Sequence, residues 1–184
     1  MDDGYGGDST LIYNGRNYPN VLKYTVTGLT TGLEYQFKLA AINFNGLSEE
    51  SNSLALIVCV APTNFRAPTL SAVTRISMTL SWNAPLQNGG CSINNYQIFM
   101  DDGASSLTPT YTEIDGLTVN NKPSLRTHPI SFNVIDTSKT FRFYMIASNS
   151  IGFAQTPTVS FVLAAKPDKP TNAPELNKDL TRTF

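Results

Sequence analysis

The residues whose side chains could take part in catalysis, metal binding or cross-linking are a repeated pair of aspartates, two cysteines and one histidine. Asp2-Asp3-Gly4 and Asp101-Asp102-Gly103 each place two carboxylates side by side, where they could bind a hard cation such as Ca²⁺. A calcium site usually takes about 6–8 oxygen ligands, and no further acidic cluster accompanies either pair. Both stretches are therefore interpreted as polar turns in which the glycine takes a positive φ.

His128 is the other candidate for chemistry. To act in catalysis it would need a nucleophile and an orienting carboxylate within hydrogen-bond reach. The sequence has no Gly-x-Ser-x-Gly turn, no phosphate-binding glycine loop and no metal-binding motif. Because His128 stands directly before Pro129 in a turn-rich stretch, we expect an exposed loop histidine. The sequence thus predicts no catalytic residue, no cofactor and no metal site.

Cys59 and Cys91 are the two cysteines of the chain. Together with a single histidine they are too few for a metal cluster. They are candidates for one disulfide if the compartment is oxidising.

The composition narrows the classes of partner. Charged residues make up 15% of the 184 residues and the net charge is −1, so no field attracts nucleic acid or an anionic membrane. No stretch approaches the roughly 20 apolar residues that a membrane-spanning helix needs. We therefore expect neither nucleic-acid binding nor membrane insertion by this segment. The 41% of hydrophobic residues is enough for a buried core.

Short runs of alternating apolar and polar residues dominate the chain, and helical periodicity is almost absent. They are rich in Val, Ile, Thr, Tyr and Phe and bounded by Gly, Pro, Asn and Asp, which is typical of strands. The runs are residues 35–41, 76–82, 130–135 and 141–147. Segments of this length and spacing predict an all-β fold, an antiparallel sandwich or barrel.

Two stretches of the sequence repeat. Met1-Asp2-Asp3-Gly4 returns as Met100-Asp101-Asp102-Gly103, at an offset of 99, and residues 34–46 align with residues 140–152, at an offset of 106. The larger second offset predicts an insertion in the second copy, which we place at residues 115–129, where turn residues concentrate. A repeat of about 100 residues is the usual size of an immunoglobulin-like sandwich.

Two groups of motifs resemble the fibronectin type III family over nearly the whole chain. The first resembles its B strand, BC loop and C strand: Trp82, Ala84-Pro85, Asn88-Gly89-Gly90, Ile93 and Tyr96. The second resembles its E–F corner and F strand: residues 27–35, Ala41, Asn43 and Gly46. The resemblance implies tandem antiparallel β-sandwiches, with seven strands in a complete module.

In that register the chain divides into three parts. Residues 1–60 form the C-terminal part of one module, from C′ to G, and residues 61–165 form a complete module. Residues 166–184 form a linker and the start of a further module. In the complete module the resemblance places strands A, B, C, C′, E, F and G at residues 68–73, 76–83, 94–101, 108–113, 130–135, 140–149 and 158–163. The first part lacks strands A and B, so either it was cut from a longer chain or another chain supplies them.

The resemblance also assigns core residues. Trp82 is expected between the two sheets, and Tyr35 is expected to form a tyrosine corner by bonding the backbone near Leu29. The second module has Phe141 at that corner position, which predicts a softer E–F corner. The complete set of expected core residues is Tyr35, Phe37, Leu39, Trp82, Tyr96, Phe141 and Phe143. Without strands A and B, the inner faces of Tyr35, Phe37 and Leu39 are expected to be exposed.

The same fold places the cysteines on either side of a module junction. Cys59 ends strand G of the first part, and Cys91 lies in the BC loop of the complete module. In this fold the preceding G strand exits beside the BC loop, so the resemblance predicts an inter-module disulfide. The alternative is two independent thiols. The position matching Cys59 after the second G strand is Ala165, so that junction is expected to lack the bridge.

A non-catalytic structural or adhesive array that binds other proteins, including neighbouring copies or filament subunits, fits these features best. Its Asn- and Thr-rich style resembles fibronectin type III arrays in large surface proteins of protists, ciliates in particular, which implies an extracellular or cell-surface location. The rival interpretation is an intracellular scaffold in a cilium or the cytoskeleton. A third is the non-catalytic part of a larger enzyme.

Overall fold

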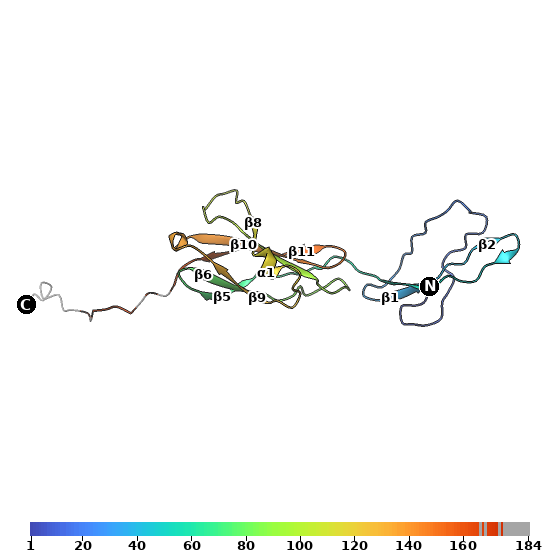
Figure 1. Cartoon of the computed structure of the whole chain (residues 1–184), viewed down its shortest axis with the longest axis horizontal. Helices are drawn as coiled ribbons and strands as arrows, with labels where there is room; N and C mark the ends of the chain where they lie inside the picture. The colour runs from blue at the N-terminus through green and yellow to red at the C-terminus, as the bar shows by residue number, and fades with distance from the viewer. Residues whose placement is uncertain (166, 168, 173, 175–184) are drawn as a thin grey trace, which may run out of the picture.

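The computed structural model describes residues 1–165, 167, 169–172 and 174. It consists almost entirely of antiparallel strands, in two regions that follow one another along the long axis of the molecule (Figure 1). We call residues 1–60 the N-terminal region and residues 61–165 the central sandwich. The residues expected to begin a further module lie almost entirely outside the described residues.

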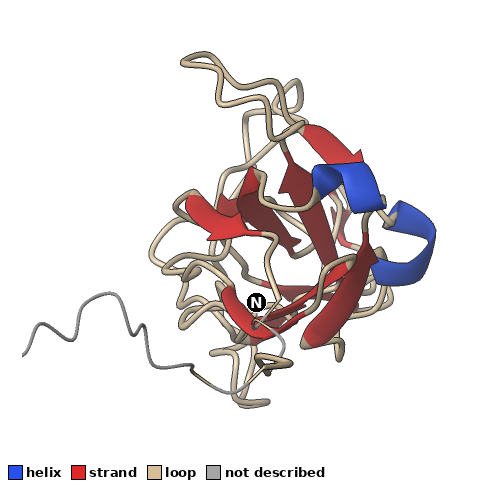
Figure 2. Ribbon diagram, turned by 90° about the vertical axis from the view of Figure 1, so that its left-hand side faces the viewer, coloured by secondary structure: helices blue, strands red, loops and turns tan. Residues whose placement is uncertain are grey.

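The central sandwich has two sheets. One has the order β5-β6-β9, and the other has the order β11-β10-β7-β8 with β12 also paired to β10. Their strands are β5 (Thr69–Val73), β6 (Ser77–Ser81), β7 (Asn95–Met100), β8 (Thr112–Ile114), β9 (Thr127–Ser131), β10 (Thr140–Ser148), β11 (Phe153–Gln155) and β12 (Val159–Val162). Since β11 and β12 both pair with β10, they are two halves of one strand position, and the seven expected positions are filled. Two short helices, α1 (Gly116–Val119) and the 3-10 helix η1 (Val134–Asp136), lie outside the strands (Figure 2).

Alternation along the strands builds the core between the two sheets. In β10 every second side chain, from Phe141 through Phe143 and Met145 to Ala147, is buried. From the facing sheet, Met78 and Leu80 of β6 are fully buried, because side chains two residues apart point to the same face of a strand. The other expected core residues of this region, Trp82 and Tyr96, are also buried, with ring centroids 5.9 Å apart.

The predicted E strand was wrong in its bounds. Residues 130–135 were expected to form it, but the strand is β9, which begins at Thr127 and ends at Ser131, and residues 134–136 form η1. Pro129 suggested a loop, yet it pairs opposite Thr79 within β9. A proline is tolerated there because β9 is the edge of its sheet, where the missing N–H breaks no ladder. Strand C′ is also shorter than expected and is confined to β8.

The N-terminal region contains two small sheets. Strand β1 (Glu34–Phe37) pairs with β4 (Leu54–Ile57), and β2 (Ile42–Asn43) pairs with β3 (Gly46–Leu47). Among the described residues, no second sheet pairs or packs with these strands as β5-β6-β9 does in the central sandwich. This region therefore has the strands of half a sandwich.

The three core residues expected in the N-terminal region differ in their burial. Leu39 is 77% exposed, so it is not a core residue, and its inner face is uncovered as expected without strands A and B; it lies beyond the end of β1. Phe37 is half-buried. Tyr35, whose inner face we expected to be exposed, is buried beneath local backbone: a Cβ added to Gly4 would lie 3.0 Å from its ring.

Candidate functional site

The two regions meet at a joint one residue long. On one side, Val58 belongs to the N-terminal region, because its N–H donates to the Leu33 carbonyl (3.0 Å) and its carbonyl accepts from the Gly32 N–H (2.7 Å). On the other side, the Val60 N–H donates to the Gly89 carbonyl of the central sandwich (2.9 Å). Only Cys59 stands between these two anchored residues. Any bend between the regions must therefore use the dihedral angles around Cys59.

Cys59 is itself tied to the central sandwich. The structure brings the two predicted partners together, because Cys59 and Cys91 are joined by a disulfide with their Cα atoms 5.6 Å apart. This separation is typical of a disulfide. Cys91 lies in the loop between β6 and β7, the BC loop of the sequence interpretation. The bridge thus fixes the one residue that could act as a hinge.

Two glycines beside Cys91 let the chains approach closely. Gly89 has φ +76°, and a Cβ added there would overlap the carbonyl oxygen of Val60. Gly90 has φ +83°, and its added Cβ would lie 2.5 Å from the backbone nitrogen of Gly32. Only glycine satisfies both the left-handed backbone and the close contact. The BC loop therefore packs directly on the linker and on the N-terminal region.

Asn149 clamps the linker from the other side. Its Nδ2 donates to the carbonyls of Val60 (2.7 Å) and Asn88 (2.9 Å), and its Oδ1 accepts from the backbone N–H groups of Ile151 (2.9 Å) and Gly152 (3.0 Å). The side chain of Asn149 is buried, so all of its hydrogen-bonding capacity is used within the joint. We missed this residue in the sequence. The available signal was the repeated Asn-x-x-Gly at residues 43–46 and 149–152.

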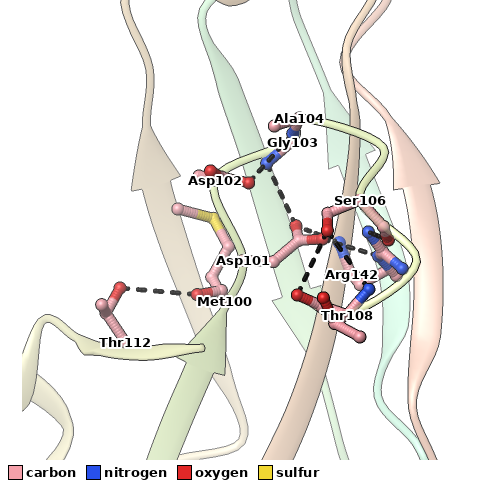
Figure 3. Close-up of polar contacts among 9 residues, drawn as sticks. All are labelled: Met100, Asp101, Asp102, Gly103, Ala104, Ser106, Thr108, Thr112 and Arg142. Carbon is pink, nitrogen blue, oxygen red and sulfur yellow. Dashed lines mark hydrogen bonds and ion pairs between the residues drawn. The ribbon is translucent and has the colours of Figure 1, made fainter. Parts of the chain in front are cut away.

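The second copy of the Asp-Asp-Gly motif closes a turn, as the turn interpretation predicted (Figure 3). The Asp101 side chain is fully buried, and its Oδ1 accepts from the N–H groups of Arg142 (2.8 Å) and Gly103 (3.3 Å). Its Oδ2 accepts from Arg142 Nε at 2.6 Å. Arg142 also donates to the Ser106 carbonyl (2.7 Å), which holds the loop after β7. Both carboxylate oxygens of Asp101 therefore accept hydrogen bonds from the protein itself.

The first copy of the motif makes the same backbone contacts. Asp2 Oδ1 accepts from the N–H groups of Gln36 (2.9 Å) and Gly4 (3.3 Å). Gln36 is the counterpart of Arg142, so the first copy lacks the ion pair. The described residues hold no group of three or more His, Cys, Asp or Glu side chains placed to bind a metal ion.

His128 does not lie in an exposed loop, so that expectation was wrong. It is part of β9, its side chain is 11% exposed, and its Nε2 lies 2.9 Å from Asp115 Oδ2. The misplaced E strand explains the error, because residues 127–129 were assigned to the inserted loop. The pair joins β9 to the residue that precedes α1.

Comparisons with known proteins agree with this architecture. No protein-family model matches the chain. It is 33% identical to human myomesin-2 over 109 residues, which cover 52% of the chain, and 32% identical to human fibronectin type-III domain-containing protein 3A over 88 residues, which cover 46%. Among solved structures, domains A168–A170 of titin superpose with a TM-score of 0.52 at 19% identity, covering 68% of the chain and 39% of that structure.

The fold is an antiparallel β-sandwich of the fibronectin type III and immunoglobulin-like class. Relatives with fibronectin type III domains indicate a protein-interaction module of this class. The chain spans 7% of the length of each of the two relatives named above, so they bear on the domain rather than on whole proteins. No helix among the described residues is both long enough and apolar enough to cross a membrane.

Proposed function

We propose that this chain is a non-catalytic segment of a structural or adhesive array, in which fibronectin type III modules bind other proteins and are held at a fixed angle. The observation that carries the proposal is the one-residue joint at Cys59. A freely jointed array would need a flexible linker of several residues, rich in Gly and Ser. Here the linker is hydrogen-bonded on both sides of Cys59 and bridged at Cys59 itself.

The proposed organisation has three parts: residues 1–60 as the C-terminal part of a module, residues 61–165 as a complete module, and residues 166–184 as a linker and the start of another. The open face of the β1–β4 sheet supports the incomplete module, since the equivalent face of β10 is covered by β5, β6 and β9. Of residues 166–184, only 167, 169–172 and 174 are among the described residues.

A cell-surface or extracellular location, in the manner of large protist surface proteins, is the favoured setting because a structural disulfide persists where the surroundings are oxidising. A ciliary or cytoskeletal scaffold is the rival. The sequence has no Asn-x-Ser/Thr glycosylation site, which favours the intracellular scaffold.

Peptide mapping of the protein isolated from its source under alkylating conditions tests both the disulfide at the joint and the proposed location. We expect a linked peptide pair containing Cys59 and Cys91 that separates on reduction. The same digest from a reduced sample is the control. Two free, fully alkylated thiols in the native protein would contradict the fixed joint and favour the intracellular scaffold.

A further inference from the structure

The two F–G turns of the chain share a backbone pairing and a side-chain cap, although Gly46 has φ +134° and Gly152 does not have a positive φ. In the N-terminal region, β2 and β3 pair Asn43 with Gly46, and in the central sandwich the Asn149 N–H donates to the Gly152 carbonyl (2.9 Å). The side-chain acceptor repeats as well. Asn43 Oδ1 accepts from the Asn45 N–H at 2.8 Å, just as Asn149 Oδ1 accepts from the Ile151 N–H at 2.9 Å. The backbone pairing and the asparagine cap are thus present in both turns.

The side-chain amide donor has a hydrogen-bond partner in only one of the two turns. Asn149 Nδ2 donates to the Val60 and Asn88 carbonyls, whereas Asn43 Nδ2 has no partner among the described residues. The Asn43 amide is held in place by the same bond through its oxygen. It therefore presents an oriented donor of the kind that binds linker main chain in the central sandwich.

The glycine of each turn supplies a second, independent observation. A Cβ added to Gly152 would lie 2.9 Å from the Ala61 side chain, so the linker packs against the bare backbone of this glycine. A Cβ added to Gly46 would meet nothing within 4 Å. The linker therefore covers the Cβ position of Gly152, whereas the Cβ position of Gly46 is uncovered.

Apolar side chains surround the open turn. Phe44 is fully exposed, Leu47 is 71% exposed and Ile42 is 43% exposed. The turn lies at the end of the molecule farthest from the central sandwich (Figure 1). An exposed apolar cluster next to an unfilled donor is typical of an interaction surface.

We infer that Asn43 and Gly46 form a binding site for extended linker main chain, supplied by a module on the N-terminal side in the same polypeptide. The carbonyl of one linker residue accepts from Asn43 Nδ2, and the next residue, small like Ala61, packs on Gly46. The ligand class is that of Val60-Ala61-Pro62. This inference rests on the proposed array, and it extends the clamp at Asn149 to a second joint.

The sequence itself provides the probe. Met1 corresponds to Met100, so a copy of residues 59–99 placed directly before Met1 continues in register into the N-terminal region. In that copy both cysteines are changed to serine, which leaves the native Cys59–Cys91 bridge as the single disulfide. The chimera supplies the equivalents of Val60, Ala61 and Asn88 to the open turn.

The readout is hydrogen exchange of the Asn43 side-chain amide, followed by NMR. We expect exchange at least about 10-fold slower in the chimera than in the parent chain, approaching that of Asn149. Asn43→Asp is the matched variant, because it keeps the oxygen that caps Asn45 and removes the donor. It should lower the unfolding midpoint of the chimera and leave the parent chain unchanged.

A monomeric chimera with a folded N-terminal region and a freely exchanging Asn43 amide would overturn the inference, and so would a doubled mass that shows linker exchange between copies. If the chimera does not fold, the parent chain is titrated to millimolar concentration with a peptide of residues 57–64 carrying Cys59→Ser. Shifts at Asn43 and Gly46 that vanish in Asn43→Asp support the site, and their absence overturns it. Neither result depends on the Cys59–Cys91 bridge, so failure here leaves the peptide-mapping test intact.

Discussion

The same strand appears twice in this molecule, once under a second sheet and once without one. In β10, Phe141, Phe143 and Met145 are buried, whereas of their counterparts Tyr35 is buried, Phe37 is half-buried and Leu39 is largely exposed. The alternation of residue types is alike in both. The difference shows that alternation decides which face a side chain is on, while burial depends on the sheet that lies opposite.

The turns and loops of the two regions behave differently from the cores. The Asp-Asp-Gly turn and the F–G turn are formed in both regions, with matching hydrogen bonds. These devices need only the neighbouring strand, not the opposite sheet. The N-terminal region therefore retains the local features of the fold without its core.

Removing the central side chain of the sandwich should produce the largest contrast. Trp82→Ala should lower the free energy of unfolding by about 4 kcal/mol, because it empties a large volume between the sheets. Leu39→Ala should change it by less than about 0.5 kcal/mol, since that side chain is exposed. Denaturant unfolding measures both, and a comparable loss for Leu39→Ala would show that its face is covered in solution.

The two copies of the aspartate turn should differ next. Asp101→Ala should destabilise the protein by about 3 kcal/mol, because it leaves the partly buried Arg142 guanidinium without its partner. Asp2→Ala removes only hydrogen bonds to backbone and should cost about 1 kcal/mol. Urea unfolding of the two variants provides the comparison. Equal losses would mean that the Asp101–Arg142 ion pair adds nothing to the shared turn.

The E–F corners form a third contrast. Tyr35 closes the first corner by accepting from the Thr30 N–H at 2.9 Å, next to the expected position at Leu29. Tyr35→Phe should therefore cost about 1 kcal/mol and speed hydrogen exchange at Thr30. An unchanged Thr30 exchange rate in Tyr35→Phe would show that the hydroxyl does not hold the corner. The predicted softness of the second corner is tested by comparing exchange at Thr30 with exchange at Lys139.

The smallest effect concerns how the second corner is held. There Lys139 donates to Asp136 at 2.8 Å, and this bond, helped by the Asn133 N–H, lowers the pKa of Asp136 below its ordinary value of 3.8. A depressed folded pKa gives stabilisation that is complete above about pH 4 and is lost as the pH falls through the folded value. NMR shifts of Lys139 should follow this titration while those of Thr30 stay constant. Parallel shifts at both residues would contradict a separate charged corner.

Much of the fold could be predicted from the sequence because strand alternation and the internal repeat are local signals. The E strand was misplaced because a proline usually indicates a loop, and Pro129 is tolerated in β9 only because β9 is an edge strand. Leu39 was included in the expected core because it continues the F-strand alternation of a complete module, although the first part lacks the strands A and B that would cover it. Asn149 was missed because its partners, Val60 and Asn88, are distant in sequence.

The repeat offset also needed the strand register. Tyr35 pairs with Leu56, and Phe141 pairs with Phe161, so the last strand repeats at an offset of 105 rather than 106. The residue matching Cys59 is therefore Ala164 and not Ala165. The prediction that the following joint lacks a bridging cysteine is unchanged, because both residues are alanine.

The fixed joint is tested most directly by the distance between the two regions. Spin labels on unnatural amino acids at Glu49 and Lys122, both exposed, report it by pulsed electron resonance without using the cysteines. We predict a narrow distance distribution in the oxidised chain and a clearly broader one in the Cys59→Ser, Cys91→Ser double variant. A broad distribution in the oxidised chain, or equal widths in both, would contradict a joint held by the Cys59–Cys91 bridge.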